Sequence, residues 1–356
     1  MTDPRPPIKV LIVEDSQVAR DYLTYILSSD PAIQVIGTAN NGEEAIQAVR
    51  DKRPDIVTMD IDMPKMDGFE ATRIIMETVP TPIVNVSASW DPKEVEKTFL
   101  AMEAGALAAV RKPVGVAHPD YKDQAKELIQ TIKLKSEVKV IRRRPRAKHG
   151  KDTPAGKTST TLSPAVTNIK VVAIGASTGG PPVIETILSG LPKDFHAPLL
   201  IVQHIAPGFI QGFADWLANA CRFPVKIAAP CDFPLPGHAY IAPDGAHMGV
   251  DAGGRIVLEG SEPEGGLRPA VSYLFRSVAE VFGRNMVGVL LTGMGKDGAH
   301  ELKKMKEKGA ITIAQDKESC VVYGMPGEAV NLNAATYMLS PPKIAAFLAG
   351  LRRTNG

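Results

Sequence analysis

The stretch from Val171 to Pro182 reads VVAIGASTGGPP, and it decides how the second half of the chain folds. Its first residues, Val171–Ile174, are apolar and mostly β-branched, which is typical of a buried strand. The glycines that follow permit a sharp turn, and Pro181 and Pro182 suit the first turn of a helix. A strand, a glycine-rich turn and a helix in this order predict the start of a βαβ unit.

Short apolar runs, each expected to form a strand, recur along the whole chain. After Pro182 they lie at Leu199–Val202, Val287–Leu291 and Ile311–Ala314. Before Val171 there are five, at Val10–Val13, Val35–Thr38, Ile56–Met59, Ile83–Val86 and Leu107–Val110. Helical patterns separate them, at Val18–Leu27, Glu43–Val49, Pro181–Leu188, Phe209–Ala220, Val271–Phe282 and Ala299–Lys308. Strands that alternate with helices predict parallel sheets built from βαβ units, so both halves of the chain are expected to be α/β.

The segment His238–Leu258 departs from this alternation. Its short alternating runs flank Asp244-Gly245 and Gly253-Gly254, which are residue pairs that favour tight turns. We therefore expect hairpins here, inserted into an otherwise doubly wound parallel sheet.

Length and composition limit the classes of protein to consider. A chain of 356 residues exceeds one ordinary domain, and 44% hydrophobic with 22% charged residues is a balance that folds rather than stays disordered. The segment Met1–Pro7 is polar, and no apolar run is long enough to span a membrane, so we expect a cytoplasmic protein without membrane insertion. Three cysteines without C-x-x-C spacing indicate neither a disulfide framework nor a zinc site.

A basic segment separates the two halves. Between Lys133 and Lys157 there are ten Lys and Arg against two acidic residues, a charge of +8 in a chain whose net charge is +2. Pro145–Asn168 is rich in Pro, Gly, Ser, Thr and Lys without hydrophobic periodicity, which is typical of a linker. Arg142–Arg146 also suits a phosphate or an acidic partner, but no aromatic residues are interleaved as in nucleic-acid modules, so we favour a tether and expect no nucleic-acid partner. The predicted units are a domain at 8–134, a basic flexible linker at 135–168 and a domain at 169–350.

Acidic residues follow two of the strands expected in the first half. Glu14 and Asp15 come directly after the first strand, and Asp60 comes directly after the third. The carboxyl ends of parallel strands meet at one sheet edge, so these carboxylates should lie close together. They would repel one another unless a cation lay among them, and oxygen ligands of this kind suit Mg²⁺. For any one acid taken alone, a helix or turn cap is the better interpretation, and the magnesium site depends on all three acids together.

Two further polar side chains are expected at the same edge. Ser87 ends the fourth strand and Lys112 ends the fifth, where a hydroxyl and an ammonium can contact a phosphoryl group on a central carboxylate. Together with the acids and with Met63-Pro64-x-Met66-Asp67-Gly68, they resemble the response-regulator receiver domain. The resemblance implies a flavodoxin-like, five-stranded parallel sheet.

The receiver resemblance also implies roles for these residues. Asp60 would accept the phosphoryl group, Glu14 and Asp15 would hold Mg²⁺ with it, and Ser87 and Lys112 would contact the phosphoryl group. Receivers often carry an aromatic switch residue three positions before the lysine, and that position is Ala109 here. A switch based on an aromatic rotamer is therefore not assumed.

Ser177 occupies the glycine-rich turn of the opening stretch. Such a turn lifts a serine hydroxyl above the sheet edge, and the following helix N-terminus offers amides to an oxyanion, so a catalytic serine is indicated. A phosphate-binding loop is the alternative. The stretch lacks the lysine of G-x-x-x-x-G-K-[ST] and the full G-x-G-x-x-G spacing.

A catalytic serine needs a base and a carboxylate that orients the base. His204 directly follows an expected strand and should lie at the sheet edge beside Ser177, whereas His247, in the hairpin segment, is the second choice. Asp297 follows another strand within LTGMGKDG and suits the orienting role, although an aspartate that only caps a helix is also compatible with this position. The order Ser, His, Asp differs from that of α/β-hydrolases, but triads are defined by geometry rather than by chain order.

Four segments now resemble the catalytic domain of the chemotaxis protein-glutamate methylesterase (CheB) family: Ile174–Gly180, Val202–His204, Leu291–Gly298 and Val322–Pro326. A receiver, a linker and this domain match the family's architecture from about Ile8 to Ala349. Ser272 is a departure, since aspartate is usual there, but it lies outside the predicted triad. The resemblance implies a doubly wound α/β methylesterase domain with a hairpin insertion.

The family resemblance implies hydrolysis of glutamyl methyl esters on chemoreceptors, with deamidation of receptor glutamines. Ser177 would attack, His204 would transfer the proton and Asp297 would orient the imidazole. Backbone amides near Thr178 and Met294 are the candidates for the oxyanion hole. A CheA-type histidine kinase would supply the phosphoryl group, and the unphosphorylated receiver would cover the active site. No metal is expected in the esterase site.

Two other classes of function remain open at this point. One is a phosphorylation-regulated binding or transcription module, although no helix-turn-helix or aromatic-basic surface is recognisable. The other is a nucleotide-binding domain that uses Gly175–Gly180 as its phosphate loop.

Overall fold

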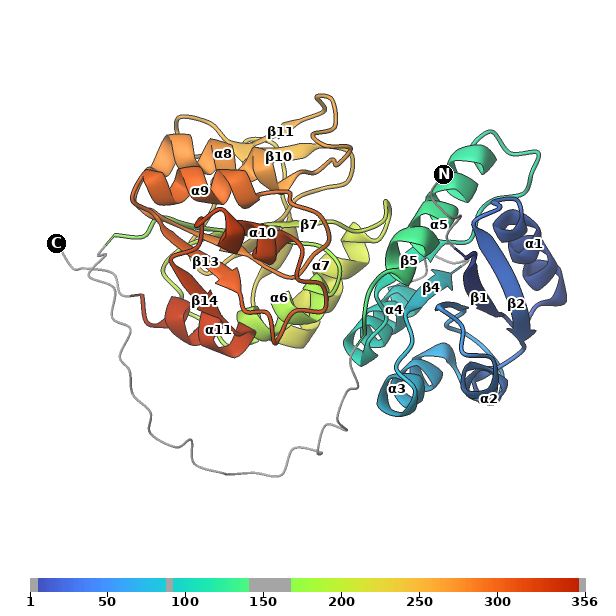
Figure 1. The fold of residues 1–356 in the computed structure, drawn as a ribbon. Coiled ribbons are helices and arrows are strands. Elements are labelled where there is room, and N and C mark those ends of the chain that lie inside the picture. Colours follow the sequence, from blue (N-terminus) through green and yellow to red (C-terminus); the bar gives the residue numbers. More distant parts are fainter. Residues whose placement is uncertain (1–5, 88–91, 141–167, 352–356) are drawn as a thin grey trace, which may run out of the picture.

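The computed structural model describes residues 6–87, 92–140 and 168–351, which form two α/β domains (Figure 1). The first domain contains a five-stranded parallel sheet of order β2-β1-β3-β4-β5. Its strands are β1 (Ile8–Val13), β2 (Ile33–Ala39), β3 (Ile56–Met59), β4 (Ile83–Ser87) and β5 (Ala108–Arg111). The strand order reverses between β1 and β3, so their carboxyl ends border the crevice where a ligand binds in such sheets. The flavodoxin-like prediction is confirmed.

Five helices belong to this domain: α1 (Gln17–Ser28), α2 (Gly42–Lys52), α3 (Gly68–Thr78), α4 (Pro92–Ala104) and α5 (Tyr121–Ser136). Successive side chains of β1 point to opposite faces of the sheet. Val10 and Ile12 belong to a core with α1 and α5, whereas Leu11 and Val13 belong to a core with α2 and α3. Both faces are thus covered, as parallel sheets require.

The second domain contains a seven-stranded parallel sheet of order β14-β13-β12-β6-β7-β9-β8. Its strands are β6 (Val171–Ala176), β7 (Leu199–Gln203), β8 (Val225–Ile227), β9 (Ala239–Ile241), β12 (Met286–Leu290), β13 (Ile311–Gln315) and β14 (Tyr337–Leu339). Every strand predicted after the linker is confirmed. The short strands β8 and β14 lie at the two edges of the sheet, where the sequence shows only brief apolar runs.

The segment predicted to form hairpins forms one. Strands β10 (His247–Val250) and β11 (Ile256–Glu259) pair antiparallel, as expected from Gly253-Gly254. The earlier run, β9, instead joins the main sheet and pairs parallel with β7 and β8. All three residues of β9 are buried, which suits a strand covered on both faces rather than a hairpin arm exposed on one.

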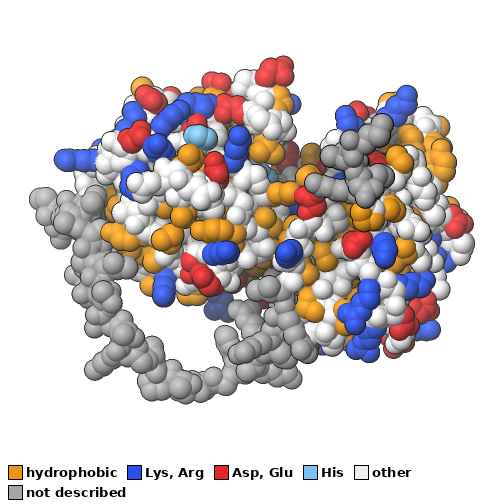
Figure 2. Space-filling model, viewed as in Figure 1, with side chains coloured by type: hydrophobic (Ala, Val, Ile, Leu, Met, Phe, Trp, Pro, Cys, Tyr) orange, Lys and Arg blue, Asp and Glu red, His pale blue; other side chains and the backbone are white. Residues whose placement is uncertain are grey.

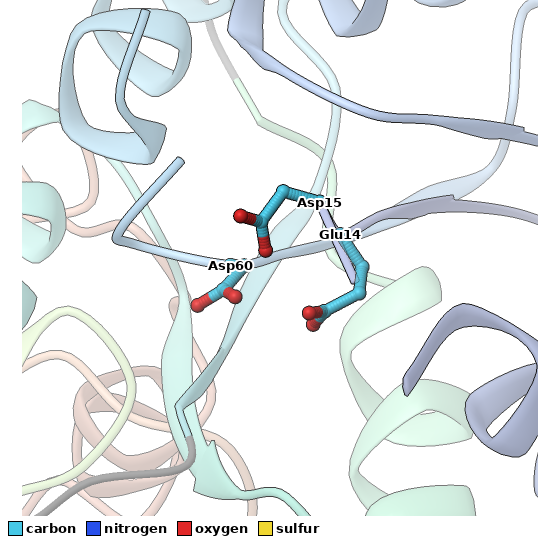
Figure 3. A group of neighbouring side chains, drawn as sticks. All are labelled: Glu14, Asp15 and Asp60. Atoms are coloured by element: carbon cyan, nitrogen blue, oxygen red, sulfur yellow. The ribbon is translucent and has the colours of Figure 1, made fainter. Parts of the chain in front are cut away.

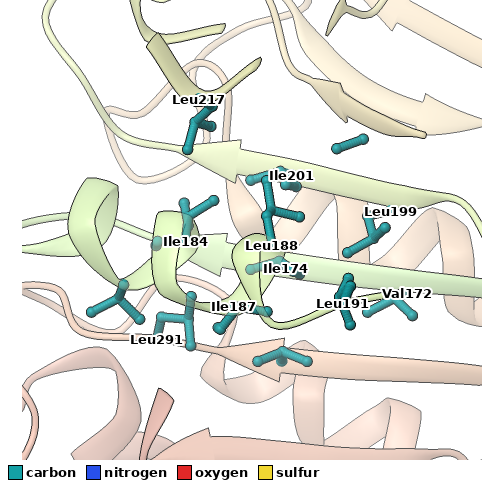
Figure 4. Packing of buried hydrophobic residues seen from close by; sticks show 14 of the residues in the cluster. Val172, Ile174, Ile184, Ile187, Leu188, Leu191, Leu199, Ile201, Leu217 and Leu291 are labelled. Carbon is teal, nitrogen blue, oxygen red and sulfur yellow. The ribbon is translucent and has the colours of Figure 1, made fainter. Parts of the chain in front are cut away.

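Helices cover both faces of the second sheet: α6 (Gly180–Ser189), α7 (Ile210–Cys221), α8 (Val271–Phe282), α9 (Ala299–Glu307), α10 (Met325–Asn331) and α11 (Pro341–Ala349). One core joins the sheet to α6, α7 and α11, and the other joins it to α8, α9 and α10. Figure 4 shows Ile184, Ile187 and Leu188 of α6 packed on side chains of β6 and β7. Their spacing of three and four residues places them on one face of the helix.

The two domains form two lobes in contact, and charged residues of both signs are interspersed over the face shown in Figure 2. Helix α4 packs against α6 and α7. Phe99 of α4 is fully buried and stacks on Trp216 of α7, with ring centroids 5.2 Å apart. Met102 and Ala109 of the first domain belong to the same apolar core as the second sheet. The contact between the domains is therefore continuous with a hydrophobic core.

The boundary of the predicted linker differs slightly from the structure. Helix α5 runs to Ser136, so Lys135 lies in its last turn rather than in the linker. At this position Lys135 contacts Thr178 of the second domain. The basic stretch Arg142–Arg146 lies outside the described residues.

Candidate functional site

Ser177 lies at the carboxyl end of β6, in the turn that leads into α6. Its backbone N–H donates to the carbonyl of Thr292, at 3.0 Å, and its own carbonyl accepts from the Gly180 N–H, at 2.8 Å. The turn requires glycine at two positions. Gly179 has φ +79°, and a Cβ on Gly180 would lie 2.0 Å from the side-chain oxygen of Gln203. These contacts fix the backbone of Ser177 at the sheet edge.

Gln203, at the end of β7, joins the turn to the neighbouring strand. Its side-chain amide donates to the carbonyl of Ser177 at 2.9 Å and to the carbonyl of His204 at 2.8 Å. The His204 N–H in turn donates to the carbonyl of Ala176 at 2.9 Å. Sequence analysis assigned no role to Gln203. The signal for one was a polar residue at the end of an otherwise apolar, buried strand.

His204 and Asp297 face each other at this edge. The His204 Nε2 lies 3.0 Å from Asp297 Oδ2, and the two side chains are only 11% and 10% exposed. Because Nε2 faces Asp297, Nδ1 is the ring nitrogen left for Ser177. The three residues thus come together from β6, β7 and the loop that follows β12.

Asp297 does not cap the helix that follows it. Its carboxylate accepts instead from the first two amides of α8, at 2.6 Å from Val271 N and 2.9 Å from Ser272 N. Burial acts to raise the pKa of Asp297, but His204 and the Ser272 hydrogen bonds outweigh burial, so the pKa is lowered. The carboxylate is therefore held ionised beside the imidazole.

Ser177, Thr178 and His204 line one cavity of about 360 Å³. Arg268 lines it from the same domain, and Ala109, Glu127 and Lys135 line it from the first domain. Met294 is half-exposed and is not among the described residues that line the cavity. Of the two candidates for the oxyanion hole, the structure brings only Thr178 into the cavity.

The loop after β12 packs directly against the serine turn. A Cβ on Gly293 would lie 2.7 Å from the Cβ of Ser177 and 2.3 Å from the sulfur of Met325. Real Cβ atoms do not approach other atoms so closely, so only glycine fits without a shift of Ser177 or Met325. Gly293 therefore serves close packing against the serine.

His247, the second choice for the base, lies apart from this cavity. It is fully buried, its Nδ1 accepts from the N–H of Ala270 at 3.2 Å, and its Nε2 lies 3.2 Å from the carbonyl of Glu262. Both ring nitrogens are thus engaged by the backbone. The geometry favours His204 as the base.

The acidic residues of the first domain also come together (Figure 3). Carboxylate oxygens of Glu14, Asp15 and Asp60 lie within 4.8 Å of one another, at the carboxyl ends of β1 and β3. Such a set of oxygen donors fits Mg²⁺. Asp60 is nearly buried, and a Cβ on Gly68 would lie 1.9 Å from its carbonyl oxygen, which explains the glycine after Asp67.

Lys112 bridges two of these carboxylates. Its Nζ lies 2.7 Å from Asp60 Oδ2 and 2.7 Å from Glu14 Oε2. Burial raises the pKa of Glu14 and the Asp60 charge adds to this, while Lys112 opposes both. Burial acts to lower the pKa of Lys112, but the two carboxylates outweigh burial and raise it. Ser87 is buried at the end of β4, where its carbonyl accepts from the Lys112 N–H at 2.8 Å.

Arg20 of α1 is a supporting residue that sequence analysis missed. Its Nη1 donates to the carbonyls of Glu14 and Asp15, at 2.7 and 2.8 Å. The signal was present, because Arg20 lies three residues before Leu23 on the buried face of an amphipathic helix. A charged residue there needs polar partners.

Comparisons with known proteins identify the family of each domain. Residues 172–348 match a family model described as CheB methylesterase, and residues 10–118 match one described as response regulator receiver domain. A protein-glutamate methylesterase/protein-glutamine glutaminase 1 from Syntrophus aciditrophicus is 57% identical over 344 residues, covering 97% of this chain and 98% of the relative. A protein-glutamate methylesterase/protein-glutamine glutaminase from Nitrosospira multiformis is 56% identical over 349 residues, covering 98% of each chain.

A solved structure extends the comparison. The crystal structure of the Thermotoga maritima CheB methylesterase catalytic domain is 40% identical, with a TM-score of 0.50, and covers 52% of this chain and 100% of that chain. None of the helices among the described residues combines the length and apolar character needed to cross a membrane.

Proposed function

The chain belongs to the CheB methylesterase family, and we propose that Ser177, His204 and Asp297 are the catalytic triad of this receiver-regulated protein-glutamate methylesterase and protein-glutamine glutaminase. The observation that carries the proposal is the 3.0 Å contact between His204 Nε2 and Asp297 Oδ2 beside the cavity that Ser177 lines. A serine, an imidazole and a buried carboxylate in this relation are what acyl transfer requires.

The chemistry follows from the geometry. Ser177 Oγ attacks the carbonyl carbon of a γ-glutamyl methyl ester, and its proton passes to Nδ1 of His204. Asp297, whose pKa is lowered, stays ionised and stabilises the imidazolium from the Nε2 side. The tetrahedral intermediate expels methanol, which takes the proton back from His204, and leaves an acyl group on Ser177. Water then attacks with His204 as base and releases the glutamate side chain. With a glutamine substrate the leaving group is ammonia.

Backbone amides of the serine turn would stabilise the oxyanion. Thr178 follows Ser177 at the start of the turn and lines the cavity, so its N–H is the first candidate. The Met294 amide would add a second donor if the loop after β12 moved toward the substrate. Each such donor contributes about 3 kcal/mol in comparable enzymes. We propose that the esterase site uses no metal or cofactor, since these side chains and amides carry every step above.

The receiver would be phosphorylated on Asp60 by a histidine kinase of the CheA type. Glu14, Asp15 and Asp60 would hold Mg²⁺, which neutralises phosphoryl oxygens when it is bound. Lys112, already at 2.7 Å from Asp60, and the hydroxyl of Ser87 would contact the phosphoryl group. A phosphoryl group on Asp60 would compete with the carboxylates for Lys112 and so rearrange this edge of the sheet.

The contact between the domains explains how such a change would control the esterase. The receiver lines one side of the cavity through β5 and α5, which supports the proposal that the docked receiver would obstruct the approach of a receptor helix to Ser177. We propose that phosphorylation shifts the receiver to an undocked state. The proposed division is a receiver at 8–134, a linker at 135–168 and a catalytic domain at 169–350. The substrates would be the methylated cytoplasmic helices of chemoreceptors, and the enzyme would act in the cytoplasm.

Labelling with a fluorophosphonate, which traps active-site serines, tests the proposal. We expect the phosphorylated full chain to be labelled on Ser177 and to release methanol from a methylated receptor fragment. Ser177→Ala should abolish both signals while the thermal unfolding midpoint stays unchanged, and Ser261→Ala, at an exposed serine of the same domain, should change neither. Labelling elsewhere, or nucleotide binding at Gly175–Gly180 without esterase activity, would overturn it.

A further inference from the structure

We propose that His247 is a positioning residue for the hydrolase reaction, because it fixes the first turn of α8, whose amides hold the carboxylate of Asp297. This inference rests on the proposed triad. His247 itself lies outside the cavity that contains Ser177 and His204, and it acts through the backbone.

The hydrogen bonds of His247 define its tautomer. The Ala270 N–H can only donate, so Nδ1 of His247, at 3.2 Å, must be the unprotonated nitrogen. Nε2 therefore carries the proton and donates to the carbonyl of Glu262, also at 3.2 Å. The ring is fully buried and stacks on Tyr273, with centroids 4.9 Å apart and planes at 16°. The imidazole thus joins the hairpin strand β10 to the start of α8 through specific contacts.

The N-terminus of α8 lacks an ordinary cap. Ala270 is its N-cap residue and has no side chain that can accept from the helix amides. The carboxylate of Asp297, 26 residues after Val271, takes this place by accepting from Val271 N and Ser272 N. The orientation of these amides follows from the backbone at Ala270, whose N–H is held by His247.

Asp297 is sensitive to the position of this turn. The same oxygen, Oδ2, accepts from Val271 N at 2.6 Å and faces His204 Nε2 at 3.0 Å. A shift of α8 that moves the carboxylate therefore changes its contact with the catalytic imidazole directly. The Ser272 hydroxyl adds to the coupling by accepting from the Gly298 N–H at 2.9 Å, next to Asp297. Small displacements of catalytic groups have large effects, since about 1 Å can cost on the order of 100-fold in rate.

Two substitutions separate this role from simple packing. His247→Phe keeps an aromatic ring for Tyr273 but removes the acceptor for Ala270. His247→Asn loses the ring but offers an amide oxygen near the position of Nδ1. We measure kcat in the phosphorylated full chain, normalised to the concentration of Ser177 that reacts with the fluorophosphonate. We expect the Phe variant to lose roughly 10- to 100-fold in this kcat, with KM within about twofold of wild type. The Asn variant should recover most of that loss.

The pH dependence of kcat/KM distinguishes a positioning role of His247 from a role in packing alone, which would leave this dependence unchanged. With Asp297 loosened, the protonated form of His204 loses stabilisation, so the acid limb of kcat/KM should move to lower pH in the Phe variant and return in the Asn variant. Should the Phe variant fail to fold, His247→Gln replaces it, because its amide reaches the Nε2 position and leaves Ala270 unpaired. Gln should then show the loss and the pH shift, and Asn should not.

Three results bear on the proposal. Wild-type kcat and an unchanged acid limb in the Phe or Gln variant would overturn it. Equal losses in the variants with and without an acceptor would also overturn it, because packing alone would then explain them. Asp297→Ala is measured beside them: if that variant kept wild-type turnover while Ser177 was still labelled, the proposed role of Asp297 would be wrong rather than that of His247 alone.

Discussion

Lys135, in the last turn of α5, contacts the hydroxyl of Thr178, the residue that follows the proposed nucleophile. The receiver thus contributes a basic side chain to the lining of the cavity that Ser177 also lines. Burial lowers the pKa of this ammonium from the ordinary lysine value of 10.5 to about 8. A lowered pKa means that docking the charged form has a free-energy cost. Lys135 therefore weakens the docked state while contributing one hydrogen bond to it.

Lys135→Met should strengthen docking. The lost hydrogen bond to a neutral hydroxyl is worth about 1 kcal/mol, which is less than the cost of burying the ammonium that the lowered pKa reflects. We expect the unphosphorylated variant to be several-fold less active than unphosphorylated wild type, with equal activity after full phosphorylation. Lys126→Met, at an exposed position of the same helix, is the control. Higher basal activity in Lys135→Met would show that the lysine holds the domains together instead.

The same lysine predicts a pH dependence. The docked ammonium loses its proton near pH 8, whereas a released one keeps it up to about 10.5, so rising pH stabilises the docked state. The ratio of unphosphorylated to phosphorylated activity should therefore be constant below about pH 8 and fall between about pH 8 and 10.5. In Lys135→Met this ratio should be flat. If the ratio fell equally in wild type and in Lys135→Met, titratable groups other than Lys135 would be responsible for the pH dependence.

Phe99→Ala should release the receiver. The ring is fully buried against Trp216 and Phe213, with centroids 5.2 and 5.4 Å away, and truncating such a ring costs about 3–5 kcal/mol in a core. We expect basal activity to rise at least about tenfold and stimulation by a small-molecule phosphodonor to shrink correspondingly. Tyr25→Ala, at an exposed aromatic on α1, should change neither quantity. Unchanged basal activity in Phe99→Ala would mean that this contact does not hold the receiver in place.

Phosphorylation of Asp60 should require Mg²⁺. Its carboxylate lies with those of Glu14 and Asp15, and an anionic phosphodonor meets their repulsion unless a cation is bound. Incubation with acetyl phosphate should add one phosphoryl group by intact-protein mass spectrometry, and EDTA should prevent the addition. Asp60→Asn should remain unlabelled. Equal labelling of that variant would place the phospho-acceptor elsewhere.

Gly293→Ala should impair catalysis more than stability. The added Cβ would lie 2.7 Å from the Cβ of Ser177, so the serine or the Gly293 loop must move. A misplaced nucleophile should lower kcat and the rate of fluorophosphonate labelling by roughly 10- to 100-fold. Gly260→Ala, where nothing lies within 4 Å of the new atom, is the matched control. Normal labelling of Gly293→Ala would contradict the tight packing around Ser177.

Sequence analysis predicted the members of the proposed triad because all three residues follow expected strands of a parallel sheet. Ser177, His204 and Asp297 had to meet at one edge once the strands were recognised. The supports of the triad could not be found in this way. The contact of His247 with Ala270 depends on where a hairpin folds back onto α8, which local patterning does not determine.

The contact between the two domains, like that between His247 and Ala270, could not be predicted from sequence patterns. In the sequence, Phe99 is an apolar residue within a receiver helix and cannot be told from a residue of the receiver's own core. In the structure its aromatic partner Trp216 belongs to α7. Lys135 was counted among the charges of a tether because it lies within a basic run and at the start of the predicted linker. Its burial depends on where the second domain docks, and that is a property of three-dimensional fit.

The cavity shared by the two domains has a pharmacological consequence. Its walls come from β5 and α5 on one side and from the serine turn on the other, so it exists in full only while the domains are docked. A small molecule that fills it would bind the docked enzyme and not the released one, and by mass action it would stabilise the docked form, which is proposed to be inactive. Such a compound would stabilise the contact between the receiver and the second domain. Its apparent affinity would fall as the phosphorylated fraction of the enzyme rose.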